Sequence, residues 1–226
     1  MRNLQAVIFD MDGLILDTER VYSEGWQKGA TAKNIQLPPG FVENAAGRSV
    51  DDNIGALKAA GFDHELIHQI RKEREAYFYE QLDRDEIPVK PYFFDLIHFL
   101  RQQGIKTGLA TSSYQGRVQR MFDHYQFHDL FDVVVAGDQV SRVKPDPEIY
   151  LQVLSQLQTA KEESLVLEDS VVGGRAASSG GIPFILVPDK SAAKSQTVPD
   201  PFPNLLGVKE SLGTVLEWLK EFEHKD

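Results

Sequence analysis

The chain contains no cysteine among its 226 residues. Disulfide bonds, thiol nucleophiles and zinc–thiolate centres are therefore excluded. The absence of cysteine also fits a protein of a reducing compartment. Histidine is sparse as well, and the six histidines show no spacing typical of a metal site, so we assign no metal-binding role to them.

Long apolar stretches are missing too. No window approaches the roughly 18 consecutive apolar residues that a membrane-spanning helix needs. The opening residues, MRNLQAVIFD, have neither a long apolar segment nor a small-residue cleavage site, so we expect no signal peptide. We therefore expect a cytoplasmic protein with no membrane partner.

Positive charge is scarce, because 24 Lys and Arg stand against 34 Asp and Glu, a formal net charge of −10. This balance argues against nucleic acid or an anionic membrane as a partner of the whole surface. An anionic substrate would need a local positive group or a metal ion. We find no internal repeat or low-complexity segment, and a monomer is the default expectation.

Five short apolar runs are typical of buried strands. They are continuous rather than alternating, as expected when helices cover both faces of a sheet. The runs are Ala6–Phe9, Thr107–Ala110, Val133–Ala136, Leu165–Leu167 and Phe184–Val187. Helical patterns at 93–104, 146–158, 173–179 and 211–222 alternate with the later runs. This order predicts an α/β fold with a doubly wound, mostly parallel sheet.

The stretch between the first two runs predicts a second domain. Residues 17–88 contain several helical patterns but no good buried strand. Plain loops longer than about 15 residues are uncommon. We therefore predict an all-helical domain at 17–88, inserted into a core made of 1–16 and 89–226. Pro88 and Pro91 mark the expected return hinge.

Polar residues follow four of the predicted strands. Ligands bind at the carboxyl ends of the strands in parallel α/β sheets. In chain order the residues at these ends are Asp10 and Asp12, then Thr111, Ser112 and Ser113, then Lys144, then Glu168, Asp169 and Ser170. Carboxylates gathered at one place repel each other unless a cation joins them, and oxygen ligands of this kind suit Mg²⁺. The sequence therefore predicts a magnesium site that faces a phosphate.

These residue types fit phosphoryl transfer. Asp10 can attack phosphorus to give an aspartyl-phosphate. Asp12, followed by a glycine that lets the chain turn, can protonate the leaving oxygen and later activate water. Thr111, together with Ser112, can donate hydrogen bonds to phosphoryl oxygens, and Lys144 can neutralise the charge of the phosphoryl group. The alternative for Thr111, and equally for Ser112 or Ser113, is a hydroxyl that only satisfies a turn.

Four segments together resemble a known family. FDMDGLILDTE, ATSS, KPDPEIY and LEDSVVGGRAA resemble, in order, the four motifs of the haloacid dehalogenase-like (HAD) hydrolase superfamily. The resemblance is closest to the subgroup that contains β-phosphoglucomutase and sugar-phosphate phosphatases. It implies a Rossmann-like core with a helical cap inserted after the first motif.

The resemblance also implies roles for single residues. Asp10 would be the nucleophile and Asp12 the acid and base, while Thr111 and Lys144 would bind the phosphoryl group. Mg²⁺ would be held by the Asp10 side chain, the Asp12 backbone carbonyl and Asp169, with Glu168 close to the ion or also coordinating it. An acid at position 12 argues against dehalogenation, because family members that displace halide lack one there.

Residues in the predicted cap are candidates for substrate contact. In AGRSVDDNIG, Gly47 allows a close backbone approach and Arg48 can hold an anionic or hydroxylated part of a substrate. The alternative is an exposed loop that begins a helix. Tyr22 occupies the position at which β-phosphoglucomutases carry a histidine. In those enzymes the cap arginine also lies farther along the chain from the cap glycine than Arg48 lies from Gly47.

We therefore expect a Mg²⁺-dependent phosphatase that hydrolyses a small phosphomonoester, with a sugar phosphate as one candidate. A phosphomutase is the main alternative, since it shares the core residues. A signalling receiver domain also combines acids, Mg²⁺, a threonine and a lysine, but it places the phosphorylated aspartate after a middle strand and has no helical insertion. A catalytically inactive relative is a further alternative, against which the complete set of motif residues argues.

Overall fold

The computed structural model describes residues 3–45, 50–189 and 202–223. These residues form two compact units. The first comprises 3–16, 89–189 and 202–223, and the second comprises 17–45 and 50–88. Gly47 and Arg48, the predicted substrate residues, lie outside the described residues. No helix in the described part of the chain is long and apolar enough to cross a membrane.

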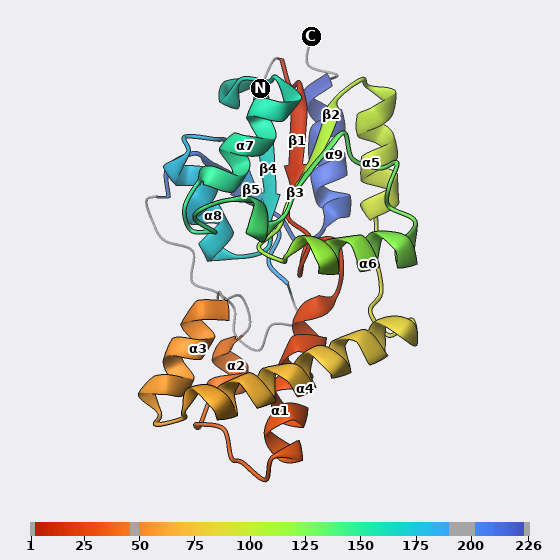
Figure 1. Ribbon diagram of the computed structural model, residues 1–226. Helices are drawn as coiled ribbons and strands as arrows, with labels where there is room; N and C mark the ends of the chain where they lie inside the picture. Colours follow the sequence, from red (N-terminus) through yellow and green to blue (C-terminus); the bar gives the residue numbers. More distant parts are fainter. Residues whose placement is uncertain (1–2, 46–49, 190–201, 224–226) are drawn as a thin grey trace. The chain divides into compact units, whose positions relative to one another are not determined.

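The first unit is built on a parallel sheet that has six strands within the described residues, in the order β3-β2-β1-β4-β5-β6 (Figure 1). The strands are β1 (Ala6–Phe9), β2 (Lys106–Ala110), β3 (Val133–Val135), β4 (Ser164–Glu168), β5 (Phe184–Leu186) and β6 (Leu205–Val208). Every neighbouring pair is parallel. The predicted α/β class with a doubly wound parallel sheet is confirmed. The five predicted runs correspond to β1 to β5 to within one residue at each end.

Strand β6 was not predicted, and the exposure of its residues explains why. It lies at the edge of the sheet next to β5. Leu206 and Val208 are 44% and 51% exposed, and a glycine separates them. The other edge strand, β3, is a run of three valines and was predicted, whereas β6 alternates between half-buried and exposed residues and has no continuous buried run to detect.

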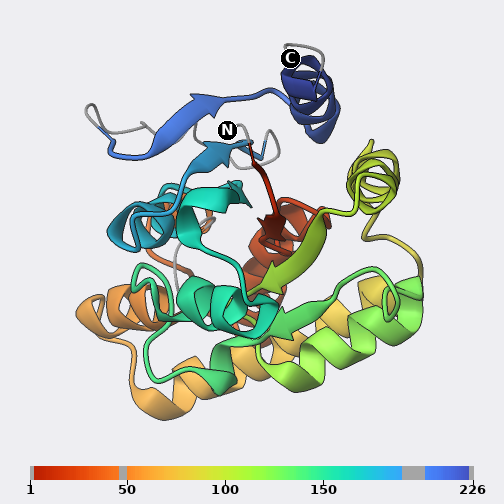
Figure 2. The same ribbon diagram turned by 90° about the horizontal axis from the view of Figure 1, so that it is seen from above.

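Helices cover both faces of the sheet. They are α5 (Phe93–Gln102), α6 (Gln115–Tyr125), α7 (Glu148–Leu157), α8 (Val171–Ser179) and α9 (Leu212–Glu223), with single 3₁₀ turns η1 (Gly137–Gln139) and η2 (Lys161–Glu163). Helices α7 and α8 lie on one face and α5 and α9 on the other (Figure 2). Helix α6 is a further element that the sequence analysis did not predict, although Val118, Met121 and Phe122 recur at helical spacing on it and are buried.

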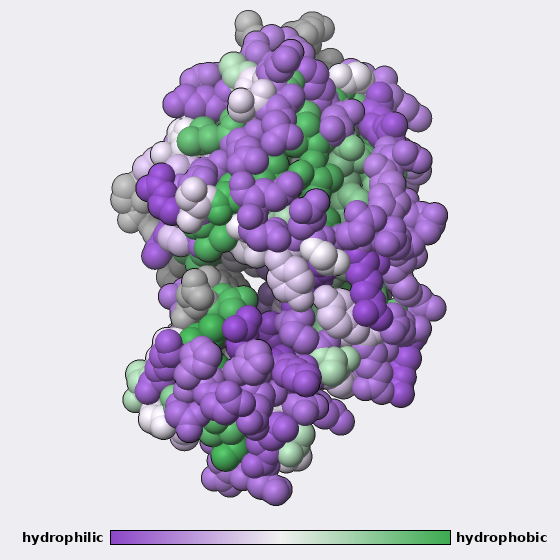
Figure 3. Space-filling view, in the orientation of Figure 1, coloured by the Kyte–Doolittle hydropathy of each residue, from purple (hydrophilic) through white to green (hydrophobic). Residues whose placement is uncertain are grey.

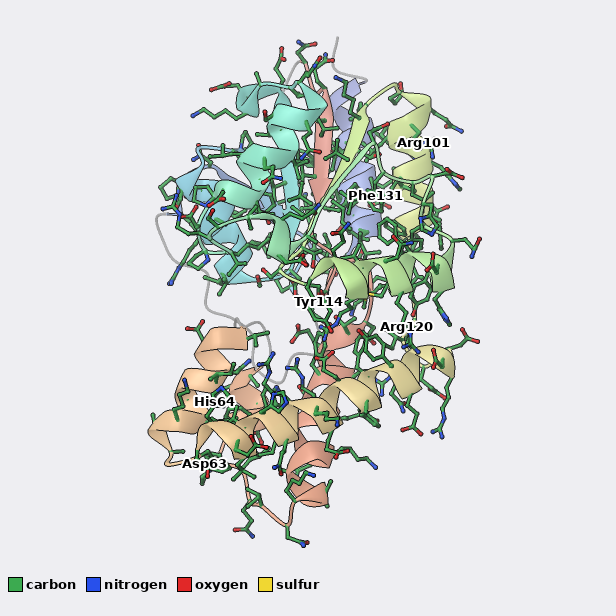
Figure 4. The ribbon with its side chains drawn as sticks, viewed as in Figure 1. Asp63, His64, Arg101, Tyr114, Arg120 and Phe131 are labelled. Carbon is green, nitrogen blue, oxygen red and sulfur yellow. The ribbon has the colours of Figure 1, made fainter. Side chains whose placement is uncertain are left out.

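Two apolar clusters hold the helices on the sheet. On the α7 and α8 face, Ile8 and Val166 of the central strands pack with Ile149 and Val153 of α7. The other cluster is aromatic. In it, Phe93 of α5 lies 6.0 Å between ring centroids from Phe9 of β1, and it also contacts Phe127 and Phe131. Phe131 is labelled in Figure 4. Because β1 is anchored on both faces, the residues that follow it are placed by a rigid element.

The second unit is helical. Its elements are α1 (Thr18–Ala32), α2 (Phe41–Ala45), α3 (Val50–Ala59) and α4 (His64–Asp83). Its core contains Trp26, Phe41, Leu57 and Ile70. Asp63 (Figure 4) is the N-cap of helix α4, and its side chain accepts a 2.7 Å hydrogen bond from the Leu66 amide, which satisfies one unpaired N–H of the first turn.

Tyr22 of α1 is half-buried within this second unit. Its ring stacks on Phe78 of α4 at 5.2 Å between centroids. The guanidinium of Arg74 lies 5.3 Å from the same ring and 4.7 Å from the ring of Trp26. These contacts attach α1 to α4 by cation–π and stacking interactions.

The surface visible in Figure 3 is largely hydrophilic, with apolar residues in small areas. The large apolar side chains that are exposed come from separate elements, among them Phe94 of α5, Leu151 of α7 and Val208 of β6. Scattered exposure of this kind is normal for a folded protein.

Candidate active site

Three acidic residues gather where β1 and β4 end. The chain crosses from β3 at one edge to β4 beside β1, so the winding of the sheet reverses between β1 and β4. Ligands of open α/β sheets bind outside the strand ends at this point. The Asp10 amide donates to the Leu167 carbonyl at 3.0 Å, which extends the β1–β4 pairing and brings Asp10 next to the end of β4. Carboxylate oxygens of Asp10, Glu168 and Asp169 all lie within 4.8 Å of one another.

Lys144 joins these acids from the loop before α7. Its Nζ donates to Asp10 Oδ1 at 2.5 Å, to Glu168 Oε1 at 2.7 Å and to the Ala110 carbonyl at 2.8 Å. The side chain is 5% exposed. An ammonium has three N–H donors, so all three are used. Lys144 is therefore fixed between two carboxylates at the end of the sheet.

Burial and charge shift the pKa values of this cluster. Burial raises the pKa of Asp10 well above its ordinary value; Lys144 lowers it, and Glu168 and Asp12 raise it again. Burial lowers the pKa of Lys144, but the Asp10 and Glu168 carboxylates more than offset this effect and raise it well above its ordinary value. The two carboxylates therefore favour the charged form of Lys144, and positive charge near Asp10 favours its ionised form.

Glu168 is held by four hydrogen bonds. Its Oε1 accepts from Lys144 and from the Tyr150 hydroxyl, the latter at 2.5 Å. Its Oε2 accepts from the Ser170 hydroxyl at 3.1 Å and the Ser170 amide at 3.3 Å. The Ser170 hydroxyl also accepts from the Gly173 amide at 3.1 Å and caps α8. The first turn of α8 and the end of β4 therefore fix this carboxylate together.

Gly173 provides the space that Glu168 occupies. A Cβ atom built at position 173 would overlap the Glu168 carboxylate. We predict that Gly173→Ala expels the carboxylate from its four bonds and lowers the free energy of unfolding by about 1–3 kcal/mol. Urea denaturation measures this change.

Gly116→Ala on α6 is the matched control, because a Cβ there meets only ordinary contacts with Tyr114. It should leave stability unchanged or raise it by up to about 1 kcal/mol, the helix propensity difference between the two residues. Equal stability of the two alanine variants would contradict the close packing of Glu168 on Gly173.

Asp12 is held by two hydroxyls from the end of β2. Its Oδ2 accepts from the Ser113 hydroxyl at 2.9 Å and from Thr111 Oγ1 at 3.2 Å. After Asp12 the chain turns at Gly13, which has a φ of +85°. In this turn the Gly13 amide donates to the Leu16 carbonyl at 2.9 Å. Thr111 is fully buried, whereas Ser112 is exposed. Asp12 also lies near enough to Asp10 to raise its pKa.

The structure thus brings together the predicted residues of the core motifs. Asp10, Lys144, Glu168 and Asp169 form one cluster, and Asp12 with Thr111 forms a second group beside it. Tyr150 and Gly173 were not predicted as site residues. Both lie in the quoted motif segments, but their contacts with Glu168 are visible only in the folded structure.

The donor set fits a divalent cation. Carboxylate oxygens from three buried acids within 4.8 Å suit a hard metal ion. Oδ1 of Asp10 bonds to Lys144, while Oδ2 has no hydrogen-bond partner in the described part of the chain. Oδ2 is therefore available for a reacting atom, and Oδ1, which accepts one hydrogen bond, retains a second acceptor site for a metal ion.

Comparison with known proteins identifies the family. The sequence profile described as haloacid dehalogenase-like hydrolase matches residues 7–187. A phosphorylated carbohydrates phosphatase of Thermotoga maritima is 33% identical over 183 residues, which cover 79% of this chain and 82% of that protein. Validoxylamine A 7'-phosphate phosphatase of Streptomyces hygroscopicus subsp. limoneus is 26% identical over 178 residues, covering 79% and 83%.

Solved structures agree on the fold. A β-phosphoglucomutase of Clostridium difficile superposes with a TM-score of 0.76 at 23% identity, covering 97% of this chain and 96% of that one. The chain belongs to the haloacid dehalogenase-like hydrolase family. The predicted family resemblance and the predicted enzyme class are confirmed.

Proposed function

We propose that the protein is a Mg²⁺-dependent phosphatase that hydrolyses a phosphorylated carbohydrate through an aspartyl-phosphate on Asp10. The observation that carries this proposal is the bonding of Asp10, whose Oδ1 is fixed by Lys144 while Oδ2 has no hydrogen-bond partner in the described part of the chain. This arrangement orients one oxygen as a nucleophile within a cluster that suits a cation. The names of the relatives support phosphorylated carbohydrates as the substrate class.

In the first step, Asp10 Oδ2 forms a bond to phosphorus and the bond from phosphorus to the ester oxygen breaks. Protonated Asp12 gives its proton to that oxygen. In the second step, Asp12 takes a proton from water, the water oxygen bonds to phosphorus, and the bond to Asp10 breaks. Lys144 orients Asp10 and offsets negative charge on the transferring group.

Asp10 and Asp169, with the Asp12 backbone carbonyl, would hold Mg²⁺, which supplies positive charge beside the transferring phosphoryl group. Thr111 and Ser113 fix the Asp12 carboxylate. We assign the exposed Ser112 of this loop as the residue whose hydroxyl donates a hydrogen bond to the phosphoryl oxygens. Thr111 is its buried neighbour. The helical stretch 17–88 acts in this proposal as the cap that selects the organic part of the substrate.

A phosphate-release assay tests the proposed function. The purified protein with Mg²⁺ is incubated with a panel of hexose and pentose phosphates and other phosphomonoesters. We expect stoichiometric release of inorganic phosphate from at least one sugar phosphate, over many turnovers. Conversion of β-glucose 1-phosphate to the 6-phosphate without phosphate release would identify a mutase instead, and a single turnover would identify a receiver-like module.

We predict that Mg²⁺ stabilises the fold through this site. A ligand that binds only the native state at 100 times its Kd adds about 2.7 kcal/mol to the free energy of unfolding. Thermal unfolding with Mg²⁺ and with EDTA measures the effect. Asp169→Asn should remove most of the Mg²⁺-dependent rise in Tm, whereas Asp95→Asn, at an exposed position on α5, should retain it. An equal rise in both variants would place the bound ion elsewhere.

A further inference from the structure

Tyr150 is a buried titratable residue that the proposed mechanism does not use. It lies on α7 and is 0% exposed. Its hydroxyl donates to Glu168 Oε1 at 2.5 Å. Its ring lies beneath the Lys144 ammonium, with 4.9 Å between Nζ and the ring centroid. Tyr150 thus contacts both members of the Lys144–Glu168 ion pair.

The hydrogen bonds of Glu168 use its full acceptor capacity. A carboxylate offers about four lone-pair sites. Lys144 and Tyr150 occupy Oε1, and the amide and hydroxyl of Ser170 occupy Oε2. A metal ion could bind this carboxylate only if one of these bonds broke. Asp10, in contrast, has one oxygen without a hydrogen-bond partner in the described part of the chain.

The surroundings of Glu168 leave its carboxylate little freedom to turn. The backbone of α8 lies against it at Gly173, and the side chain is 1% exposed. Tyr150 is held in turn by α7, which packs on β1, β2 and β3. The tyrosine hydroxyl is therefore a rigid donor that keeps Oε1 directed at Lys144.

We propose that Tyr150 is a positioning residue, which holds Glu168 as the counter-ion of Lys144 and so keeps Glu168 out of the metal's coordination shell. This inference rests on the proposed function, since the metal is the one proposed above. It assigns the carboxylates to separate tasks. Asp10 and Asp169 bind the ion, and Glu168 fixes the lysine that orients Asp10.

Tyr150→Phe tests this role, because it retains the ring below Lys144 and removes only the hydroxyl. We expect kcat to fall by about 10-fold and KM to change by less than about 2-fold. A 10-fold fall is at the lower end of what removal of a group that orients a metal-site residue costs in activity. Without the hydroxyl, Oε1 gains a lone pair that can bind the ion. The Kd for Mg²⁺, measured by calorimetry without substrate, should therefore decrease by about 3-fold or more, because a carboxylate acceptor site is added for an ion that prefers oxygen ligands.

Two further variants complete the test. Tyr92→Phe removes a hydroxyl from a residue that is 55% exposed, and it should match the wild type in both measurements. In a Glu168→Gln background, Tyr150→Phe should change the Mg²⁺ Kd by less than about 2-fold, because residues that act through one another are not additive.

An unchanged Mg²⁺ Kd in Tyr150→Phe, or weaker binding together with a lower Tm, would overturn the proposal and leave Tyr150 a packing residue. A crystal structure of the wild type with Mg²⁺ decides the point even if the variant does not fold. Glu168 oxygens still bonded to Tyr150 and Lys144 would support the proposal, and a Glu168 oxygen about 2.1 Å from the ion would refute it. The Mg²⁺ Kd and the crystal structure with Mg²⁺ need no substrate, so these two tests stand even if the protein releases no phosphate.

Discussion

Asp10→Asn should abolish phosphate release. We expect kcat to fall by about 10⁴-fold or more, because loss of a covalent nucleophile removes the reaction path itself. The amide has the shape of the carboxylate, and its oxygen can still accept the hydrogen bond that Lys144 Nζ now gives to Oδ1. The variant should therefore fold, and circular dichroism with thermal unfolding can show that it does. Steady-state phosphate release on the best substrate of the panel measures the loss.

Asp95→Asn provides the matched control for this substitution. It makes the same chemical change at an exposed position of α5, and its kcat should stay within about 2-fold of the wild type, as for most surface substitutions. Turnover by Asp10→Asn above about 1% of the wild-type rate would contradict a nucleophilic role for Asp10.

Lys144→Met should destabilise the first unit more than any other single change considered. The substitution removes the cation that lies between Asp10 and Glu168 but keeps a side chain over the Tyr150 ring. Removal of one partner from a buried ion pair costs about 3–5 kcal/mol. We expect the free energy of unfolding in EDTA to fall by about this amount at neutral pH, with urea denaturation as the measurement. Phosphate release should fall with it.

The loss of unfolding free energy in Lys144→Met should increase with pH. Burial already raises the pKa of Asp10 in the folded protein, and Lys144 opposes this rise. Without Lys144 the folded-state pKa rises further above the unfolded value. Stability from such a group is present at low pH and is lost as the pH rises through the folded pKa. The destabilisation by Lys144→Met should therefore be larger at pH 8 than at pH 5.

Lys161→Met is the control for loss of a lysine, because Lys161 is exposed in η2. Its stability should stay within about 0.5 kcal/mol of the wild type at both pH values. A Lys144→Met protein as stable as this control would show that the ion pair contributes nothing to folding. A loss that is equal at both pH values would show that Asp10 is not the titrating group.

Local patterns explain how much of the sheet could be predicted from the sequence. Strands β1 and β4 lie in the centre and are buried along their whole length, so their apolar runs are continuous and visible. The acids that follow them could be predicted to lie together because the carboxyl ends of parallel strands lie at the same edge of the sheet. Strand β6 was missed because its residues alternate between half-buried and exposed, and because Gly207 interrupts its apolar residues.

The arrangement of the hydroxyls after β2 depends on a turn that the sequence pattern did not reveal. Ser112 was predicted to bind the phosphate together with Thr111, whereas Ser113 was not. The chain bends at Ser112 and Ser113, and the Ser113 amide donates to Thr111 Oγ1 at 3.0 Å. This turn brings the hydroxyls of Thr111 and Ser113 to Asp12 and leaves Ser112 exposed.

Other features of the site could not be predicted from local pattern at all. Whether Glu168 binds metal or Lys144 depends on Tyr150 of α7 and on the space at Gly173 of α8. These contacts join segments that are separate in the sequence, and only the packing of the helices on the sheet brings them together. The domain bounds at 17 and 88 were predicted because a stretch of this length between two strands is too long for an ordinary connection. The role of this stretch as a cap stays a prediction.

The most direct test of the account is chemical trapping of the aspartyl-phosphate. The protein, turning over its substrate with Mg²⁺, is quenched and treated with borohydride, which reduces an acyl-phosphate to an alcohol, and the peptides are mapped by mass spectrometry. We predict conversion of Asp10 to homoserine that depends on substrate and Mg²⁺ and that no other carboxylate shows. Rapid turnover with no reduced residue at position 10, or with reduction at a different carboxylate, would contradict the role of Asp10 on which the proposed mechanism depends.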